Sequence, residues 1–349
     1  MSSPPTRRSE ALALAAYAQP DLVKSIASVA TSILPYLGLS VLSYFTLGDS
    51  VLLTAGLAVL AGGFLVRTFV VFHDCTHGSL LPSKRANRYV GRVAGVLVLS
   101  PFGRWRQDHA IHHATSGDLS RRGTGDVLTL TVAEYRARSR SGRLGYRLLR
   151  NPLVMFGIGP IIAMMVGPRI ATRAQRPRLR NSVLATDAAL LVIVAGLCLL
   201  IGVGRFAVVW APSALLAGSA GIWLFYVQHQ FEDAYWQGPG EWDYTHAALR
   251  GSSYLRLPRI LRFFTGNIGL HHVHHLNARI PNYNLQRAHD DLAMFHDVPT
   301  LSLVDGLRAV NLKLFDEDSR KLVTFAQARA CAPAPRVVPA RPVAGSGVS

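Results

Sequence analysis

The chain contains four apolar runs, each about as long as the hydrocarbon core of a bilayer is thick. These runs are residues 25–47, 51–72, 182–203 and 206–227. About 20 mainly apolar residues span a membrane as a helix, because backbone groups in lipid must find their hydrogen bonds within the protein. Only 16% of the residues are charged, whereas soluble proteins average about 25%. The sequence therefore predicts an all-α integral membrane protein with four transmembrane helices.

The connections between the runs predict that the spans form two hairpins. Gly48-Asp49-Ser50 joins the first two runs and Gly204-Arg205 joins the last two. The net charge of +17 comes almost entirely from an excess of arginine, and the arginines fall between apolar runs rather than in a patch with interleaved aromatic residues. This distribution favours membrane topology over nucleic-acid binding, since cytoplasmic loops collect basic residues. Both termini and all long loops are therefore predicted to be cytoplasmic, and we expect the bacterial inner membrane.

The segments outside the spans divide the chain further. Residues 1–20 are expected to form a cytoplasmic tail, residues 21–330 the membrane domain, and residues 331–349 a disordered tail rich in Pro, Ala and Gly. Residues 151–168 are apolar, but glycine and proline interrupt them and arginines flank them on both sides. This pattern predicts a re-entrant or interfacial helix pair rather than a fifth span.

Two charges fall inside the predicted spans. Arg67 is expected to reach the membrane interface, or to contact a lipid head group or substrate carboxylate. Asp187 is expected to be satisfied by Arg180 or by water. The three cysteines lie far apart, so the sequence predicts neither a disulfide framework nor a cysteine-based zinc module.

Histidines are concentrated at span ends and in the cytoplasmic segments. An HxxxH box begins at His73, an HxxHH box begins at His109, and a second HxxHH box begins at His271. The first box directly follows the second span, and His229 directly follows the fourth. Residues spaced by three or four lie on one face of a helix, and neutral imidazole is the commonest metal ligand. The boxes therefore predict a metal site in a cytoplasmic helical cap beside the membrane.

The imidazoles are too many for one metal ion. The boxes supply eight of them, and His229 is a natural ninth ligand: His73, His77, His109, His112, His113, His229, His271, His274 and His275. A tetrahedral zinc site uses three or four protein ligands, so two ions with four or five nitrogen ligands each fit the count. A di-iron bundle based on Glu-x-x-His pairs is not supported, because no box contains Glu.

Other polar residues near the boxes are candidates for supporting roles. His272 is open as a tenth ligand or as a residue that supports the ligands. Five further residues are expected to orient imidazoles through hydrogen bonds: Asp74, Asp108, Asp118, Asn267 and Asn277.

The boxes and their surroundings resemble the membrane fatty acid desaturases, most closely the bacterial acyl-lipid, omega-6-like branch. The matching stretches are HDCTHGS, HAIHHATSGDL and HHVHHLNARIPNYNL, in this order around two apolar hairpins. The resemblance covers roughly residues 40–300 and includes the run GDVLTLTV at residues 125–132. It implies a di-iron enzyme that uses O2 to introduce a double bond into the acyl chain of a lipid, CoA or ACP ester. The box histidines are the implied ligands, and His229 is a further ligand by position.

The resemblance also implies a partner. Family members take electrons from a ferredoxin or a cytochrome b5-type protein, and no heme-binding or ferredoxin-like segment is recognisable here, so we expect a separate carrier. Four arginines are expected either to hold an anionic head group or carrier, or to act only as topology signals: Arg104, Arg106, Arg121 and Arg122.

Two other functions are compatible with parts of the pattern. A hydroxylase or ketolase acting on a fatty acid, alkane or carotenoid would have a similar pattern of histidine boxes, but the contexts ATSGDL and ARIPNY favour the acyl-lipid desaturases. A metal transporter would place polar ligands near the bilayer midplane. Here every box lies at or beyond the end of a span, which disfavours transport.

Overall fold

The computed structural model describes residues 12–173, 175–238 and 240–330. The prediction of a disordered tail at 331–349 and most of the predicted tail at 1–20 lie outside these ranges. The part of the tail that is described packs against the cap: Leu14 is buried, and the Tyr17 hydroxyl donates to Asp291 Oδ2 over 2.9 Å.

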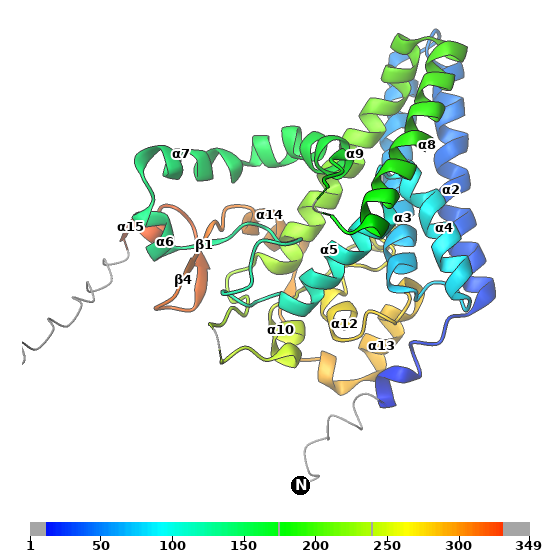
Figure 1. Cartoon of the computed structure of the whole chain (residues 1–349). Coiled ribbons are helices and arrows are strands. Elements are labelled where there is room, and N and C mark those ends of the chain that lie inside the picture. Colours follow the sequence, from blue (N-terminus) through cyan, green and yellow to red (C-terminus); the bar gives the residue numbers. More distant parts are fainter. Residues whose placement is uncertain (1–11, 174, 239, 331–349) are drawn as a thin grey trace, which may run out of the picture.

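Four helices are long and apolar enough to cross a membrane, as predicted. They are α2 (Leu22–Phe45), α3 (Val51–His77), α8 (Pro177–Ile201) and α9 (Val203–His229), which stand side by side as a bundle (Figure 1). Three of them begin three to five residues before the predicted spans, because polar residues can start a helix outside lipid. Asp21, for example, caps α2 by accepting from the Lys24 amide at 3.0 Å. The arrangement of the four as two membrane hairpins remains a prediction.

α3 and α9 continue past the apolar runs and carry histidines at their ends. The predicted spans end at residues 72 and 227, whereas the helices end at His77 and His229. Gly78 terminates α3 in a left-handed conformation with φ of +70°, which glycine adopts without strain. The two helices pack closely, since a Cβ at Gly62 would lie 2.7 Å from Leu216 Cδ2. The first box and His229 therefore lie on a rigid helix pair.

Two further helices hold the second box against α3. α4 (Lys84–Leu97) runs back along the end of α3, and α5 (Phe102–Thr115) follows a turn. A Cβ at Gly91 would collide with the Phe102 ring and lie 2.9 Å from Cys75 Cβ, so glycine permits this three-helix contact.

The glycine-broken apolar stretch forms distorted helix. α7 (Arg140–Leu149) is followed by π-helical turns at Val154–Ile158 and Ile161–Val166 and a 3-10 turn at Gly167–Arg169, with a bend of 58° between α7 and the rest. In Figure 1 this segment runs across the bundle rather than along it. By length and composition alone, the bent pair would also qualify as one broken span.

The charges inside the spans pair differently from the expectation. Asp187 forms its ion pair with Arg169, at 2.8 Å, and not with Arg180. The broken helix before α8 brings Arg169 back to the bundle. Arg67 donates to the carbonyl of Phe263 and lies 4.1 Å from the centre of the Phe263 ring. Arg67 thus joins α3 to α11 (Arg259–Phe264), a contact that the sequence did not indicate.

The remaining elements form the cap over one end of the bundle. Its helices are α6 (Val132–Ala137), α10 (Tyr244–Arg250), α12 (His271–Leu276), α13 (Leu285–Asp291), α14 (Leu303–Ala309) and α15 (Gln327–Ala330). The strands are β1 (Leu130–Thr131), β2 (Tyr254–Leu255), β3 (Thr300–Leu301), β4 (Leu314–Asp316) and β5 (Lys321–Val323). β4 pairs in parallel with β1 and antiparallel with β5, and β2 pairs in parallel with β3. The sequence pattern did not predict these short strands.

Arg150 ties the small sheet to the bundle. It is 2% exposed, and its guanidinium donates to Tyr226 Oη and Gln230 Oε1, both at 2.9 Å, and to the carbonyls of Leu128 and Leu312. One buried side chain therefore satisfies acceptors from α9, the segment before β1 and the segment before β4.

Replacing Arg150 with Met should strongly destabilise the fold. The substitution removes four hydrogen bonds that a buried guanidinium donates, and a hydrogen bond to a charged group contributes about 1.5–3 kcal/mol, so we expect a loss of about 2–4 kcal/mol. The midpoint of thermal unfolding in detergent measures the effect. Arg140→Met, at an exposed arginine of α7, is the matched control and should leave the midpoint nearly unchanged. Equal midpoints for the two variants would contradict this role for Arg150.

Candidate metal centre

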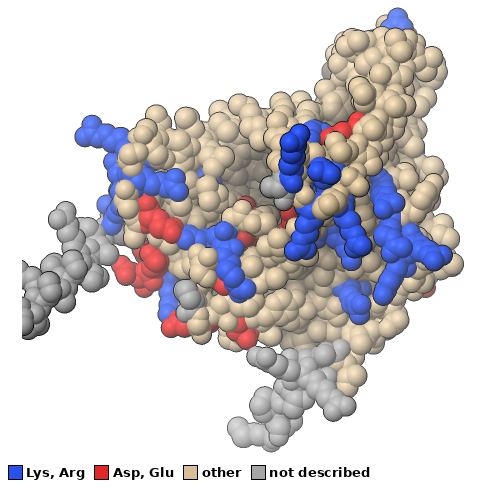
Figure 2. Space-filling model, in the orientation of Figure 1, with Lys and Arg blue, Asp and Glu red and all other residues tan. Residues whose placement is uncertain are grey.

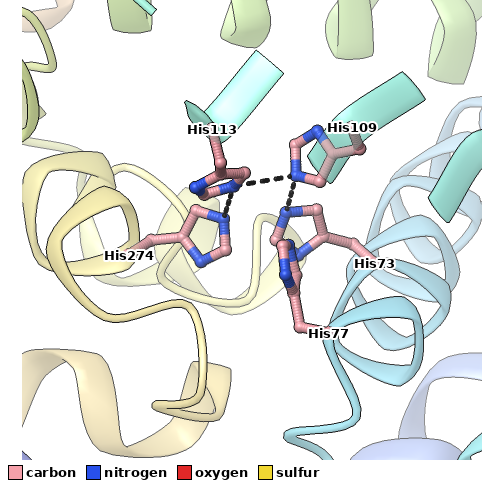
Figure 3. Close-up of side chains that lie close together, drawn as sticks. All are labelled: His73, His77, His109, His113 and His274. Atoms are coloured by element: carbon pink, nitrogen blue, oxygen red, sulfur yellow. Dashed lines mark hydrogen bonds between the residues drawn. The ribbon is translucent and has the colours of Figure 1, made fainter. Parts of the chain in front are cut away.

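The nine histidines predicted as ligands gather into two buried groups. One group contains His73, His77, His109, His113 and His274, and the other contains His112, His229, His271 and His275. Within each group, one ring nitrogen from every residue lies within 4.8 Å of all the others. Figure 3 shows the group of five, with side chains from α3, α5 and α12 pointing toward one another. We call these the five-histidine group and the four-histidine group.

In the five-histidine group the ring nitrogens face each other at close range. The Nε2 atom of His109 lies 3.0 Å from that of His73 and 3.1 Å from that of His113. The Nε2 atoms of His113 and His274 are 2.9 Å apart. Two nitrogens bound to one ion at about 2.1 Å would be about 3.0–3.4 Å apart, depending on the angle between them. The observed spacing therefore matches ligands that share a cation.

The four-histidine group gives a sharper test, because the partners of two of its rings indicate which nitrogen carries the hydrogen. His112 Nδ1 contacts the Asp126 carboxylate, and His229 Nδ1 lies 3.0 Å from the Gly251 carbonyl. Both partners only accept, so a neutral ring at either position carries its hydrogen on Nδ1 and presents a bare lone pair on Nε2. These Nε2 atoms are 3.2 Å apart, and His271 Nε2 is 3.0 Å from that of His229. Facing lone pairs repel unless a cation lies between them.

The donor set fits metal ions in further respects. Burial, reinforced by neighbouring imidazoles, lowers the pKa of His109, His274 and His275 well below its usual value. These rings are therefore neutral near pH 7, which is the form that binds metal. Nε2 of His77 and Nε2 of His275 are buried without a hydrogen-bond partner among the described residues. Metal ligation would satisfy such atoms, whereas a buried polar atom without a partner lowers the stability of the fold.

Carboxylates and carbonyls around the groups fix the ring orientation. Besides the contacts of His112 and His229, His73 Nδ1 lies 3.2 Å from Asp74 Oδ1. Asp74 Oδ2 in turn accepts from the backbone and side-chain nitrogens of Asn282, at 2.7 and 2.8 Å. Asn282 lies in the ARIPNY stretch, so the third-box context supports the first box. Such partners select the tautomer whose free nitrogen faces the metal.

The polar residues predicted as orienting partners divide into two kinds. Asp74 contacts an imidazole, as expected. The contacts of the other four are with groups other than imidazoles. Asp108 pairs with Arg104, and Asp118 pairs with Ser120 and Arg121. Asn267 donates to the Asn282 carbonyl, and Asn277 accepts from the Arg279 amide. Sequence reasoning missed Asp126 and Gly251. The available signal for Asp126 was its place in the GDVLTLTV run that resembles the family.

His272 lies outside both groups. Its side chain is fully buried, and its Nε2 is 3.1 Å from His289 Nδ1 on α13. Burial lowers the pKa of His272 to about 3, and His289 adds to the effect. Since its ring points away from the neighbouring ligands toward α13, His272 is a packing residue that joins α12 to α13.

Of the four arginines expected to be either anion contacts or topology signals, three are engaged within the protein. Arg104 donates to the Gly167 and Ile170 carbonyls. Arg121 pairs with Asp118 at 2.5 Å, and Arg122 forms a bidentate pair with Glu134. Arg106 is exposed on α5. The structural role of the first three accounts for their presence without a ligand.

Comparison with known proteins identifies the family. The family described as fatty acid desaturase matches residues 50–299. A fatty acid desaturase of Bacillus subtilis (strain 168) is 44% identical over 312 residues, which is 89% of each chain. An sn-1 oleoyl-lipid 12-desaturase of Synechocystis is 28% identical over 67% of this chain and 66% of the relative. An sn-1 acyl-lipid omega-3 desaturase (ferredoxin) of the same organism is 26% identical over 66% and 64%, respectively.

These matches confirm the resemblance that the histidine boxes indicated. They agree with the four membrane-length helices and with the two histidine groups at the ends of α3 and α9. The chain belongs to the fatty acid desaturase family and is an integral membrane enzyme of that family.

Proposed function

We propose that the protein uses two histidine-bound iron ions and O2 to introduce a double bond into a lipid-linked fatty acyl chain. The observation that carries this proposal is the convergence of nine imidazoles into groups of five and four, with bare Nε2 lone pairs facing each other. Family membership supplies the reaction class.

The five-histidine group would hold one iron and the four-histidine group the other. Iron suits the site, because imidazole binds several transition metals but zinc has no redox chemistry. When bound, the iron pair supplies the oxidising power that removes hydrogen from an unactivated methylene, which amino acid side chains lack. Asp126 and Gly251 hold protons on the Nδ1 atoms of His112 and His229, so the opposite nitrogens stay directed at the metal.

The overall reaction fixes what the partners must provide. Two hydrogen atoms leave adjacent carbons, and a second bond forms between those carbons. One O2 becomes two waters and takes four electrons, two from the acyl chain and two from a carrier. Two protons come from the acyl chain and two from solvent. The two electrons from outside require a donor, and we propose a separate carrier of the ferredoxin or cytochrome b5 type. The name of one relative, which includes ferredoxin, supports the first.

The location of the groups supports an amphiphilic substrate. Both lie at one end of the bundle, where α3 and α9 leave their apolar stretches. An acyl chain could therefore lie in apolar surroundings while its head group stays in water. The charge bias of the loops supports a cytoplasmic position for this end of the bundle, and we propose the bacterial inner membrane as the location.

Expression in a host without polyunsaturated lipids tests the proposal. Membrane lipids should gain one double bond at a fixed position, located by mass spectrometry of derivatised acyl chains. The intact lipid should carry it, because the substrate is lipid-linked. A new double bond found first in acyl-CoA or acyl-ACP would contradict the lipid-linked substrate. A hydroxylated or keto product with no new double bond would contradict desaturation itself.

A further inference from the structure

Exposed basic side chains cluster on two neighbouring segments outside the metal centre. α4 presents Lys84, Arg85, Arg88 and Arg92, and the approach to α8 presents Arg173, Arg176 and Arg178. Figure 2 shows basic side chains gathered over α4 and the beginning of α8, while acidic and basic side chains mix over the small sheet. We call these seven residues the cationic collar.

Among the residues that the structure describes, no acidic side chain forms an ion pair with the collar. Residues 75–107 and 167–186 contain neither Asp nor Glu. Within the described residues, none of the seven collar side chains forms an ion pair, whereas exposed cations elsewhere do so. Lys321, for example, pairs with Glu232 at 2.9 Å, and Arg250 with Asp297 at 2.5 Å. The collar therefore presents an unneutralised positive surface.

Packing places the collar level with the ends of the apolar parts of the spans. A Cβ at Gly95 would lie 3.1 Å from the ring of Phe72, the last residue of the predicted second span. The basic residues of α4 precede Gly95 and so lie at or beyond this level. The Gly103 amide donates to Ser182 Oγ over 2.7 Å, which sets the start of α8 beside α5 at the same end of the bundle.

The surroundings of the collar are lipid-facing. Tyr89 and Val93 lie on the outward face of α4 among the arginines and are 72% and 45% exposed. Only 6% of the apolar stretch of α8 is buried inside the protein, so its surface faces the bilayer. Arginine, tyrosine and apolar side chains mixed at the end of a span are typical of the boundary between head groups and acyl chains. A soluble acidic partner would not account for the exposed Tyr89 and Val93.

We propose that the cationic collar binds the phosphate groups of anionic phospholipids in the leaflet on the side of the histidine groups. Clusters of four to eight basic residues next to a span are enough to select anionic lipid. The collar thus concentrates phosphate-bearing lipids around the enzyme, on the side of the bundle that contains α4 and α8.

Spin-labelled lipids measure this preference directly. The purified protein is placed in phosphatidylcholine bilayers that contain trace spin-labelled phosphatidylglycerol or spin-labelled phosphatidylcholine. The ratio of their association constants gives the selectivity. The wild type should prefer phosphatidylglycerol, and the triple variant Arg85→Gln, Arg88→Gln, Arg92→Gln should lower the ratio by about fivefold or more, since each basic residue contributes about that factor. Raising the salt to about 1 M should also reduce the preference, because screening then acts within about 3 Å.

The controls separate the collar from general charge effects. The matched triple variant replaces Arg287, Arg308 and Lys321, which lie near acidic side chains, with Gln and should keep the wild-type ratio. Arg→Lys at the three α4 positions keeps the charge and should also keep the ratio, even if the Gln variant folds poorly. Absence of a phosphatidylglycerol preference in the wild type overturns the proposal. So does an unchanged preference in a folded Gln variant that instead loses binding of an acidic [2Fe–2S] ferredoxin.

Discussion

His274→Ala should abolish desaturation and remove iron from the five-histidine group. His274 Nε2 lies 2.9 Å from that of His113, and the ring sits 4.4 Å from that of His73 between centres, so the substitution removes a ligand from the middle of the group. Fewer than two irons per chain should remain after purification. Mass spectrometry measures the iron content per chain, and the amount of new double bonds in host lipids measures the activity.

Two controls make this result specific. His246→Ala changes an exposed histidine of α10 and should retain iron and activity. His271→Ala, in the four-histidine group, should also abolish activity, because both groups are needed for the same reaction. Full activity in the His274 variant would show that the third box does not bind the metal.

Asp126→Asn should lower iron affinity or activity by about 10–100-fold, the usual cost of removing the partner that orients a metal-binding imidazole. An amide in place of the carboxylate can donate an N–H to His112 Nδ1. This contact would stabilise the tautomer that carries its proton on Nε2, so Nε2 would no longer be free to bind the metal. Iron affinity, measured by competition with a chelator, reports this effect separately from turnover.

Asp108→Asn is the matched control. Asp108 lies in the same region and precedes a predicted ligand, but its carboxylate faces Arg104 at a distance of 3.6 Å. Its replacement should leave iron affinity unchanged. Equal losses in the two variants would mean that the carboxylate of Asp126 acts through general charge and not through the ring of His112.

The sequence was informative wherever a local pattern had one physical solution. Apolar length predicted α2, α3, α8 and α9, because only a helix satisfies the backbone in lipid. The spacing of the boxes and the position of His229 predicted the nine residues that gather. Counting ligands also predicted sets of four or five imidazoles, and the histidines gather into one group of five and one of four.

What the sequence could not supply depends on contacts between distant segments. The second box divides between the groups, with His109 and His113 in one and His112 in the other, because side chains four apart share a helix face. Which group each ring joins is set by α3, which supplies ligands to one group, and α9, which supplies one to the other, although these helices lie more than a hundred residues apart in the chain. The partners of Asp187 and Arg150 likewise come from segments that only the folded chain brings together.

His272 illustrates the limit within a single box. Its neighbours His271 and His274 join metal groups, and composition offers no distinction among the histidines of this stretch. The direction of the ring depends on the helical phase of α12 and on the presence of His289 opposite it. The residue type alone is therefore a weaker signal than the spacing of three and four that relates His271, His274 and His275.

The metal content of the purified wild-type protein tests the central claim most directly. Mass spectrometry should find two irons per chain, and Mössbauer spectroscopy of protein grown with 57Fe should show iron in a nitrogen-rich environment at both sites. A protein that is active with one iron, or that binds only zinc, would contradict the assignment of the two histidine groups as a di-iron centre.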